Sequence, residues 1–403
     1  MATRQKLRSP NERELQLARI GRALTFTFAA AVLVAGAVFY GLVVLLDVRE
    51  IDGTAKLDAK TLFELVKLSF GVVAGAGALV ALVVAYRRQR VDEAGAHREA
   101  TRLHTERFSQ AVDKLGSDSP AVRLGGVHAL AGLADDAPDH NLRQTCVDVP
   151  CAYLRLPFSS DPGDLPNLLS DGTPPTEEQR NAHQDRRNLY YALREVRHTI
   201  LRFIGDHYRI PEGAHRSWQG CNLDLTGVTI DGNMDLSGAT FASGKVSFGG
   251  ATFAGGKVSF DRATFSGDTV SFGGATFASS EVSFDRATFS GGTVSFGGAT
   301  FSGGTVSFGS ATFVGGEVFF SGATFSGSEV LFGGATFSGS EVLFGGATFS
   351  GGEISFSGAT FSGGRIFFGG VRFSGSEVTF GGATFVGGEM SFDGATGPIP
   401  PLQ

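Results

Sequence analysis

The stretch Ala287-Thr-Phe-Ser-Gly-Gly-Thr-Val-Ser-Phe-Gly-Gly298 decides the fold, because Ala299-Thr-Phe-Ser-Gly-Gly-Thr-Val-Ser-Phe-Gly-Ser310 follows it at once. Thirteen such twelve-residue units fill residues 239–394. A short fixed period indicates that each unit is one small structural element that stacks on its neighbours. We therefore expect a stacked repeat in the C-terminal part of the chain, with a surface for binding and no catalytic pocket.

Apolar and small polar residues alternate within each unit. Ala239-Thr-Phe241 and Val246-Ser-Phe248 both place apolar side chains at every second position. This alternation, bounded by Gly and Ser, is typical of short β-strands joined by turns. Strands this short are unstable alone, so we expect them to be rungs of a β-solenoid. The predicted core ladder comprises Phe241, Phe248, Phe253, Phe260, Phe265, Phe272, Phe277 and Phe284.

The residues just before the repeat show a spacing close to five. The triplets ending at Leu225, Ile230, Leu236 and Phe241 have apolar residues at both ends, and these end points lie five, six and five residues apart. From Cys221 onward the chain resembles pentapeptide-repeat proteins, although it has two extra residues at every second corner. The resemblance implies a right-handed quadrilateral β-helix in which two units close one coil. A flattened solenoid with one unit per coil is the alternative that the spacing leaves open.

Two apolar runs without charge lie near the N-terminus, at residues 24–46 and 68–86. Each has about the 20 residues that a hydrocarbon core requires, so residues 1–90 are predicted to form a two-helix transmembrane hairpin. Lys and Arg at the outer ends of both runs predict cytoplasmic termini and a multi-pass location in a bacterial plasma membrane. The small-residue face formed by Gly71, Gly75 and Gly77 would suit packing within the hairpin or the formation of an oligomer.

Residues 91–220 are predicted to be a cytoplasmic helical region, followed by the solenoid at 221–396 and a tail at 397–403. Trp218 is expected to cover the open apolar end of the first coil. Helices are expected at residues 91–115, 121–134, 142–156 and 177–204, with a loop rich in Pro, Asp, Ser and Gly at 157–175.

The overall layout has a second resemblance. Two apolar runs are followed by the basic Tyr86-Arg-Arg-Gln-Arg90, by Lys114-Leu-Gly-Ser117 and Val122-Arg-Leu-Gly-Gly126, and by Cys151-Ala-Tyr-Leu-Arg155. This order resembles membrane-attached pentapeptide-repeat proteins of the actinobacterial type. The resemblance is specific as to family and says little about function.

The sequence offers no motif for catalysis or for a metal. Cys146 and Cys151 are too few for a zinc site, which takes about four ligands, and the nearest histidines, His128 and His140, form no second ligand pair. A cysteine–histidine nucleophilic pair has no local signature. We therefore expect no enzyme, no catalytic residue, no cofactor and no metal.

The charge of the repeat bears on the choice of partner. Residues 239–394 hold eleven acidic and six basic residues, a net charge of −5. Some pentapeptide-repeat proteins protect DNA gyrase by imitating duplex DNA, which carries about one negative charge per 1.7 Å. A rod of about 30 Å with five net charges is several-fold sparser, so nucleic-acid-like behaviour is not expected. One corner column is predicted to hold the acidic residues Glu281, Glu317, Glu329, Glu341, Glu353, Glu377 and Glu389.

These features predict a membrane-tethered, non-enzymatic scaffold or protein-binding rod whose solenoid faces bind an unknown protein. Solenoids offer extended surfaces of this kind. The alternative is a DNA-mimic modulator of a topoisomerase, of the gyrase-protection type.

Overall fold

The computed structural model describes residues 59–168, 173–267, 269–278 and 281–398, together with scattered residues between positions 26 and 41. The chain divides into two units, residues 1–99 and 100–403. The helices ahead of the solenoid in these ranges are α2 (Ala59–Leu115), α3 (Pro120–Asp135), α4 (His140–Arg155) and α5 (Glu177–Tyr208).

The prediction of an N-terminal transmembrane hairpin is contradicted. In the part of the chain that the structure describes, no helix was found that is long and apolar enough to cross a membrane. The second predicted span, 68–86, is not an element of its own, because it lies inside α2, which runs on through Arg87 and Arg88 into charged sequence. A charge-free run of about 20 residues, on which the prediction rested, therefore did not identify a separate spanning helix. The first predicted span, 24–46, lies mostly outside the described residues.

Two further predictions depended on that hairpin. The multi-pass location in a bacterial plasma membrane is wrong on the same finding, and the membrane as a partner through two helices is not supported by the residues that the structure describes. Gly71, Gly75 and Gly77 lie within α2, and an added Cβ at any of them would meet no atom within 4 Å. The small-residue face thus has no packing partner within the described residues.

The three helices after α2 lie within a few residues of the helices that the sequence predicts. Helix α4 begins after Asp139, whose side chain accepts a hydrogen bond from the backbone of Leu142 at 2.9 Å. Helix α5 begins with a capping box in which the Thr176 and Gln179 side chains each bond to the backbone of the other. Local capping chemistry therefore sets where these helices start.

Helix α3 packs closely against the end of α2. A Cβ at Gly126 would lie 2.6 Å from the backbone nitrogen of Leu115 and 3.0 Å from the carbonyl oxygen of Ala111. Only glycine allows this approach, which explains the second glycine of Val122-Arg-Leu-Gly-Gly126.

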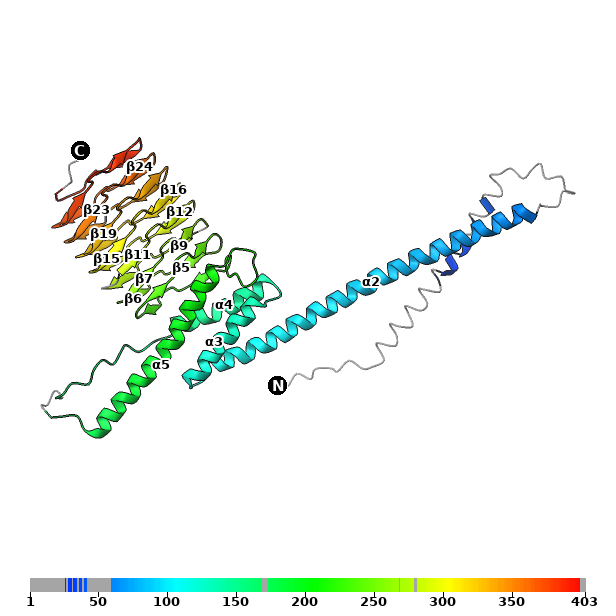
Figure 1. Ribbon diagram of the computed structural model, residues 1–403, viewed down its shortest axis with the longest axis horizontal. Coiled ribbons are helices and arrows are strands. Elements are labelled where there is room, and N and C mark those ends of the chain that lie inside the picture. Colours follow the sequence, from blue (N-terminus) through cyan, green and yellow to red (C-terminus); the bar gives the residue numbers. More distant parts are fainter. Residues whose placement is uncertain are drawn as a thin grey trace, which may run out of the picture. The chain divides into compact units, whose positions relative to one another are not determined.

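From residue 223 onward the chain forms a solenoid of four parallel sheets, called here sheets A to D (Figure 1). Sheet A contains β1 (Leu223–Asp224), β5 (Val246–Ser247), β9 (Thr269–Ser271), β13 (Thr293–Ser295), β17 (Glu317–Phe319), β21 (Glu341–Leu343), β25 (Arg365–Phe367) and β29 (Glu389–Ser391). Sheet B contains β2 (Thr229–Ile230), β6 (Thr252–Ala254), β10 (Thr276–Ala278), β14 (Thr300–Ser302), β18 (Thr324–Ser326), β22 (Thr348–Ser350) and β26 (Arg372–Ser374).

The other two sheets complete each coil. Sheet C contains β3 (Met234–Asp235), β7 (Lys257–Ser259), β11 (Glu281–Ser283), β15 (Thr305–Ser307), β19 (Glu329–Leu331), β23 (Glu353–Ser355) and β27 (Glu377–Thr379). Sheet D contains β4 (Thr240–Phe241), β8 (Thr264–Phe265), β12 (Thr288–Ser290), β16 (Thr312–Val314), β20 (Thr336–Ser338), β24 (Thr360–Ser362) and β28 (Thr384–Phe385). Because successive strands visit sheets A, B, C and D in turn, sheets A and C are opposite faces, as are B and D.

Two twelve-residue units close one coil. Val246 pairs with Val270 in sheet A, and Phe277 pairs with Phe301 in sheet B, so each residue meets its equivalent from the second unit along the chain. This register settles the question that the spacing left open in favour of the four-sided coil. The first coil is one residue shorter over β1 and β2, where Leu223 pairs with Val246.

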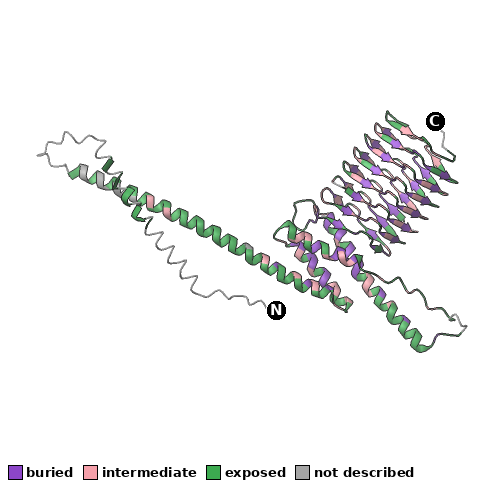
Figure 2. Cartoon of the chain, turned by 180° about the vertical axis from the view of Figure 1, so that it is seen from behind, coloured by how far each residue is buried: buried purple, intermediate pink, exposed green. Residues whose placement is uncertain are grey.

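The interior of the solenoid is filled by inward-facing Phe, Val and Ala side chains, seen as buried positions along the rungs up to the last coil (Figure 2). Phenylalanines one coil apart stack in parallel, as Phe260 does on Phe284 with centroids 4.8 Å apart. Rings of the neighbouring column meet edge to face, as Phe272 and Phe260 do at 5.5 Å. Both geometries suit the ring quadrupole, so the repeat stabilises one packing pattern many times over.

Side chains of α4 and α5 close the first coil. Nη2 of Arg197, a residue that is 4% exposed, donates to the carbonyl oxygens of Leu154 and Thr229 at 2.8 Å each. Gln144 of α4 both donates to and accepts from the backbone of Asn222. Backbone groups at the outer edge of the first coil have no preceding coil to pair with. Side chains of α4 and α5 supply hydrogen bonds to some of them instead.

The aromatic ring that covers the first coil is Tyr208 at the end of α5. Its ring centroid lies 5.2 Å from that of Phe241, and its hydroxyl donates to the carbonyl oxygen of Cys221 at 2.9 Å. Trp218, expected from the sequence in this role, is also buried but stacks on His207 instead.

Candidate functional site

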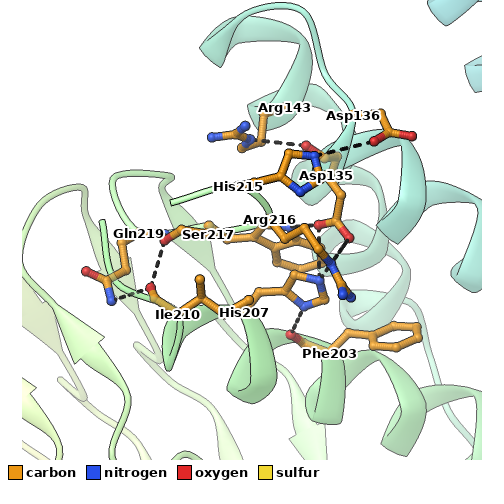
Figure 3. Close-up of polar contacts among 12 residues, drawn as sticks. Asp135, Asp136, Arg143, Phe203, His207, Ile210, His215, Arg216, Ser217 and Gln219 are labelled. Atoms are coloured by element: carbon orange, nitrogen blue, oxygen red, sulfur yellow. Dashed lines mark hydrogen bonds and ion pairs between the residues drawn. The ribbon is translucent and has the colours of Figure 1, made fainter. Parts of the chain in front are cut away.

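The carboxylate of Asp135, at the end of α3, lies at the junction between the helices and the solenoid (Figure 3). It accepts hydrogen bonds from Nε1 of Trp218 at 3.2 Å and from Nε of Arg216 at 2.9 Å. Nε2 of His207 lies 3.1 Å from its Oδ1. Burial alone would raise the pKa of Asp135, but the hydrogen bonds from His207, Arg216 and Trp218 outweigh it and hold that pKa below its usual value.

Both ring nitrogens of His207 face acceptors. Nδ1 lies 2.6 Å from the carbonyl oxygen of Phe203, one turn earlier in α5, and Nε2 faces Asp135. These two contacts, on opposite sides of the imidazole, fix the orientation of the ring. The ring also stacks on Trp218 with centroids 4.1 Å apart, which buries one face of each ring.

The junction has an ion pair and aromatic contacts, and the serine hydroxyl beside them is already hydrogen-bonded. The nearby hydroxyl of Ser217 donates to the carbonyl oxygen of Ile210 (Figure 3), and Gln219 donates to the same oxygen at 2.8 Å. These two bonds join parts of the segment 207–219 to each other, while His207, Arg216 and Trp218 hold that segment to Asp135 of α3. We interpret the junction as structural: it fixes where the first coil starts.

A cysteine–histidine pair does occur, between Cys146 of α4 and His104 of α2. Sγ of Cys146 lies 3.6 Å from Nε2 of His104, and both side chains are buried. Burial raises the pKa of the Cys146 thiol to about 12 and lowers the pKa of His104. A nucleophilic cysteine needs the opposite shift in the thiol, so this pair lacks the thiolate that catalysis requires.

The other two cysteines are in a similar environment. Burial raises the pKa of Cys151 to about 12 and that of Cys221 to about 11, and neither is in a disulfide. Among the described residues, no three His, Cys, Asp or Glu side chains gather in a way that could hold a metal ion.

A cleft of about 520 Å³ lies beside α5 and the first two coils, lined by residues that include Phe158, Tyr191 and Gly255. The hydroxyl of Tyr190 donates to Asp231 at its wall, and Arg194 donates to the same carboxylate at 3.2 Å. Burial, and then the hydrogen bond to Asp231, raises the pKa of Tyr190. These polar groups satisfy one another, so they do not define a ligand.

The eight phenylalanines named from the sequence lie inside the solenoid. None of their side chains is more than 2% exposed. Their neighbours are one another, as in the stacks of Phe248 on Phe272 at 4.9 Å and of Phe241 on Phe265 at 5.1 Å. This placement leaves no ring of the eight for contact with a partner.

The outer surface of sheets A and C holds the charged residues, and the single acidic column that the sequence suggested is in fact two. Units alternate between opposite faces because a coil contains two of them. Sheet A presents Lys245, Glu317, Glu341, Arg365 and Glu389, and sheet C presents Lys257, Glu281, Glu329, Glu353 and Glu377.

Some of these charges pair between successive coils. Nζ of Lys257 lies 2.7 Å from Glu281 on sheet C, and Arg365 lies 3.2 Å from Glu389 on sheet A. The hydrogen bond to Glu281 raises the pKa of Lys257. The carboxylates are divided between two opposite faces, and some are paired with cations. Both effects weaken the negative potential of each face.

Sheets B and D are nearly neutral. Their strands begin with a threonine at most rungs, in register from coil to coil, as Thr276 pairs with Thr300. Such ladders give two flat faces with hydroxyl groups and few charges. The four sides therefore form two kinds of surface.

Comparison with known proteins agrees with this geometry. Residues 255–294 match the family model described as pentapeptide repeats (9 copies), a stretch of just over three units. No curated protein and no solved structure matches the chain. The matched residues thus carry a pentapeptide-repeat signature, and they lie within coils of the same four-sided form as the rest of the β-solenoid.

Proposed function

We propose that the chain is a non-enzymatic, protein-binding scaffold whose working surface is the outside of the solenoid. The observation that carries this proposal is the packed core: inward side chains up to Phe373 are buried in packing, whereas each outward position repeats at a constant register over the coils. Extended faces of this kind suit a protein partner better than a small molecule.

The helical part contributes a fixed attachment. Residues 207–219 are held to α3 by the contacts of His207 and Trp218 with Asp135. Helix α5 is joined to the first coil by Arg197 and Tyr208. The solenoid therefore starts from a rigid base, which lowers the conformational cost of binding along its length.

The alternative is a DNA mimic that modulates a topoisomerase. Its strongest support is the run Glu329, Glu353 and Glu377 on sheet C, with one carboxylate per coil. At about 4.8 Å per coil this is about a third of the charge density of duplex DNA. A DNA-supercoiling assay with purified gyrase tests it, and inhibition that Glu→Gln changes on sheet C abolish would favour mimicry over the scaffold.

A photo-crosslinking experiment tests the scaffold proposal. A photoreactive residue replaces Ser295, Thr300, Thr305 or Thr312 in the full chain, one on each of sheets A to D. We expect discrete crosslinked protein bands from one or two faces and none from the others. Equal, diffuse labelling from all four faces would contradict a specific protein-binding rod.

A further inference from the structure

Three consecutive rungs of sheet A have a large apolar residue where the other rungs of that sheet have a small polar one. Phe319, Leu343 and Phe367 lie in register, since Phe319 pairs with Leu343 and Leu343 with Phe367. Ser295 precedes this set and Ser391 follows it in the same column. We call Phe319, Leu343 and Phe367 the apolar strip.

The apolar strip faces outward. The residues just before its members, Val318, Val342 and Ile366, point into the core and are at most 4% exposed. Alternate residues of a strand point to opposite sides, so the strip lies on the surface, where its members are partly exposed.

The position of the Phe367 ring fits an outward orientation. An added Cβ at Gly369 would lie 2.0 Å from Cζ of Phe367, and one at Gly345 would lie 3.6 Å from its Cε1. The ring thus covers the glycine corners of two coils instead of joining the inner stacks. A solvent-facing sheet surface is normally polar, and three stacked exceptions mark a contact surface.

Two carboxylates run beside the strip. Glu317 and Glu341 begin the strands that end in Phe319 and Leu343, two residues away and on the same face. Neither makes an ion pair with any residue that the structure describes. Arg365, the third residue of this column, is already paired with Glu389.

The dimensions of the strip match one face of a helix. Three rungs at about 4.8 Å span roughly 10 Å from the first to the last. In an α-helix, residues i, i+3 or i+4, and i+7 span about 10.5 Å along one face. A helix lying along the rod axis can therefore place one apolar side chain near each rung.

We propose that the apolar strip is a docking surface for an amphipathic helix of a partner protein, with apolar residues at i, i+4 and i+7 flanked by Lys or Arg. The inference rests on the proposed protein-binding function and names its surface. A basic helix supplies the cations that Glu317 and Glu341 lack. A second copy of the chain that faced this surface with its own sheet A would bring only Lys245, three rungs from Glu317, and the paired Arg365.

The proposal is tested by measuring the binding of synthetic peptides to the purified full chain by fluorescence anisotropy. Each peptide has about 18 residues, which is long enough to form a helix. The probe is a Leu/Lys peptide with leucines on one helical face. Two controls are a peptide of equal composition with scattered leucines and a version with Glu in place of Lys. We expect the full chain to bind the first peptide and to bind both controls at least about tenfold more weakly.

The matched variants replace strip residues by serine, which stands in this column at neighbouring rungs and is compatible with the fold. Phe319→Ser/Leu343→Ser/Phe367→Ser should weaken binding about tenfold or more, while Leu331→Ser on the opposite sheet C leaves it unchanged. Glu317→Gln/Glu341→Gln should weaken binding several-fold and flatten its salt dependence. Circular dichroism and thermal unfolding verify that each variant keeps the fold.

Several results would overturn the docking surface. One is binding of the Leu/Lys peptide by the triple serine variant as tight as by the natural chain. A second is a loss of binding in Leu331→Ser as large as in the triple variant. A third is binding of a control peptide as tight as that of the Leu/Lys peptide. Sedimentation that shows a dimer of the natural chain, dispersed by the triple variant, would assign the strip to self-association. Crosslinks to a protein from sheet B, C or D, with no effect of the strip variants, would keep the scaffold function and reject only this surface.

Discussion

Phe253 and Phe277 stack face to face, with ring centroids 4.6 Å apart and ring planes 1° apart, although a whole unit of the repeat lies between theirs in the sequence. The same relation recurs along the column, since Phe277 stacks on Phe301 at 4.7 Å. A twelve-residue sequence repeat is thereby converted into a coil of two units, and every phenylalanine of the column supports the one before and the one after it.

Removing one ring from the middle of a column should destabilise the solenoid strongly. Phe284 is fully buried and stacks on Phe260 and Phe308. Phe284→Ala should lower the free energy of unfolding by about 3–5 kcal/mol, measured by urea unfolding. Ser295→Ala, at an outward position, is the control and should change it by less than about 0.5 kcal/mol. Similar effects of the two substitutions would contradict the assignment of inside and outside.

Two adjacent glycines of α3 should respond to alanine with opposite signs. A Cβ at Gly126 would meet the backbone of Leu115 at 2.6 Å, whereas one at Gly125 would meet no atom within 4 Å. Gly125→Ala should stabilise the helix by up to about 1 kcal/mol. Gly126→Ala should destabilise the chain, because α3 must move away from α2. Thermal unfolding measures both, and stabilisation by Gly126→Ala would disprove the close packing.

The junction should lose stability in acid. The pKa of Asp135 is lower in the folded chain than in the unfolded one, so its contribution is complete above the unfolded value, about 4. That contribution is lost as the pH falls through the lower, folded value. Asp135→Asn should cost about 2–3 kcal/mol at neutral pH, because His207 and Arg216 lose a charged acceptor.

Other carboxylates, such as Asp231, also have lowered pKa values. The contribution of Asp135 is therefore distinguished by measuring the free energy of unfolding at acid pH in the natural chain and in Asp135→Asn. We expect stability to fall less steeply below about pH 4 in Asp135→Asn than in the natural chain. Parallel curves for the two proteins would show that the junction is not charged as described.

The three cysteines should be unreactive in the folded chain. Cys146, Cys151 and Cys221 are at most 2% exposed, and their thiol pKa values are raised. Iodoacetamide at neutral pH should leave all three unmodified in the native protein and alkylate all three in urea, as read by mass spectrometry. Rapid alkylation of Cys146 alone would show that His104 activates it.

The period and the alternation of Phe, Val and Ala sufficed to predict the solenoid and its inward side chains. They did not decide the coil length, because a step of one unit or of two units brings Phe onto Phe. Departures from the consensus contained the missing signal. The Asp-Arg dipeptides that begin at Asp261 and Asp285 stand two units apart, with Gly-Gly in the unit between them.

Other features depend on contacts that a sequence pattern does not encode. Asp135 and Trp218 are 83 residues apart, and neither stands in a motif that points to the other. The acidic column was predicted as one because the coil length was open, and the four-sided coil divides it between sheets A and C. The transmembrane prediction relied on the length of the apolar runs and their lack of charge, without the extent of the helix that contains the second run.

The central claim is that the rod binds a protein through the outer face of sheet A. The most direct measurement is photo-crosslinking from Ser295, which lies one rung before the apolar strip. It is carried out in the natural chain, in Phe319→Ser/Leu343→Ser/Phe367→Ser and in Leu331→Ser. The account predicts a discrete crosslinked protein in the first and third and its loss in the second. An equally strong crosslink in all three would contradict it.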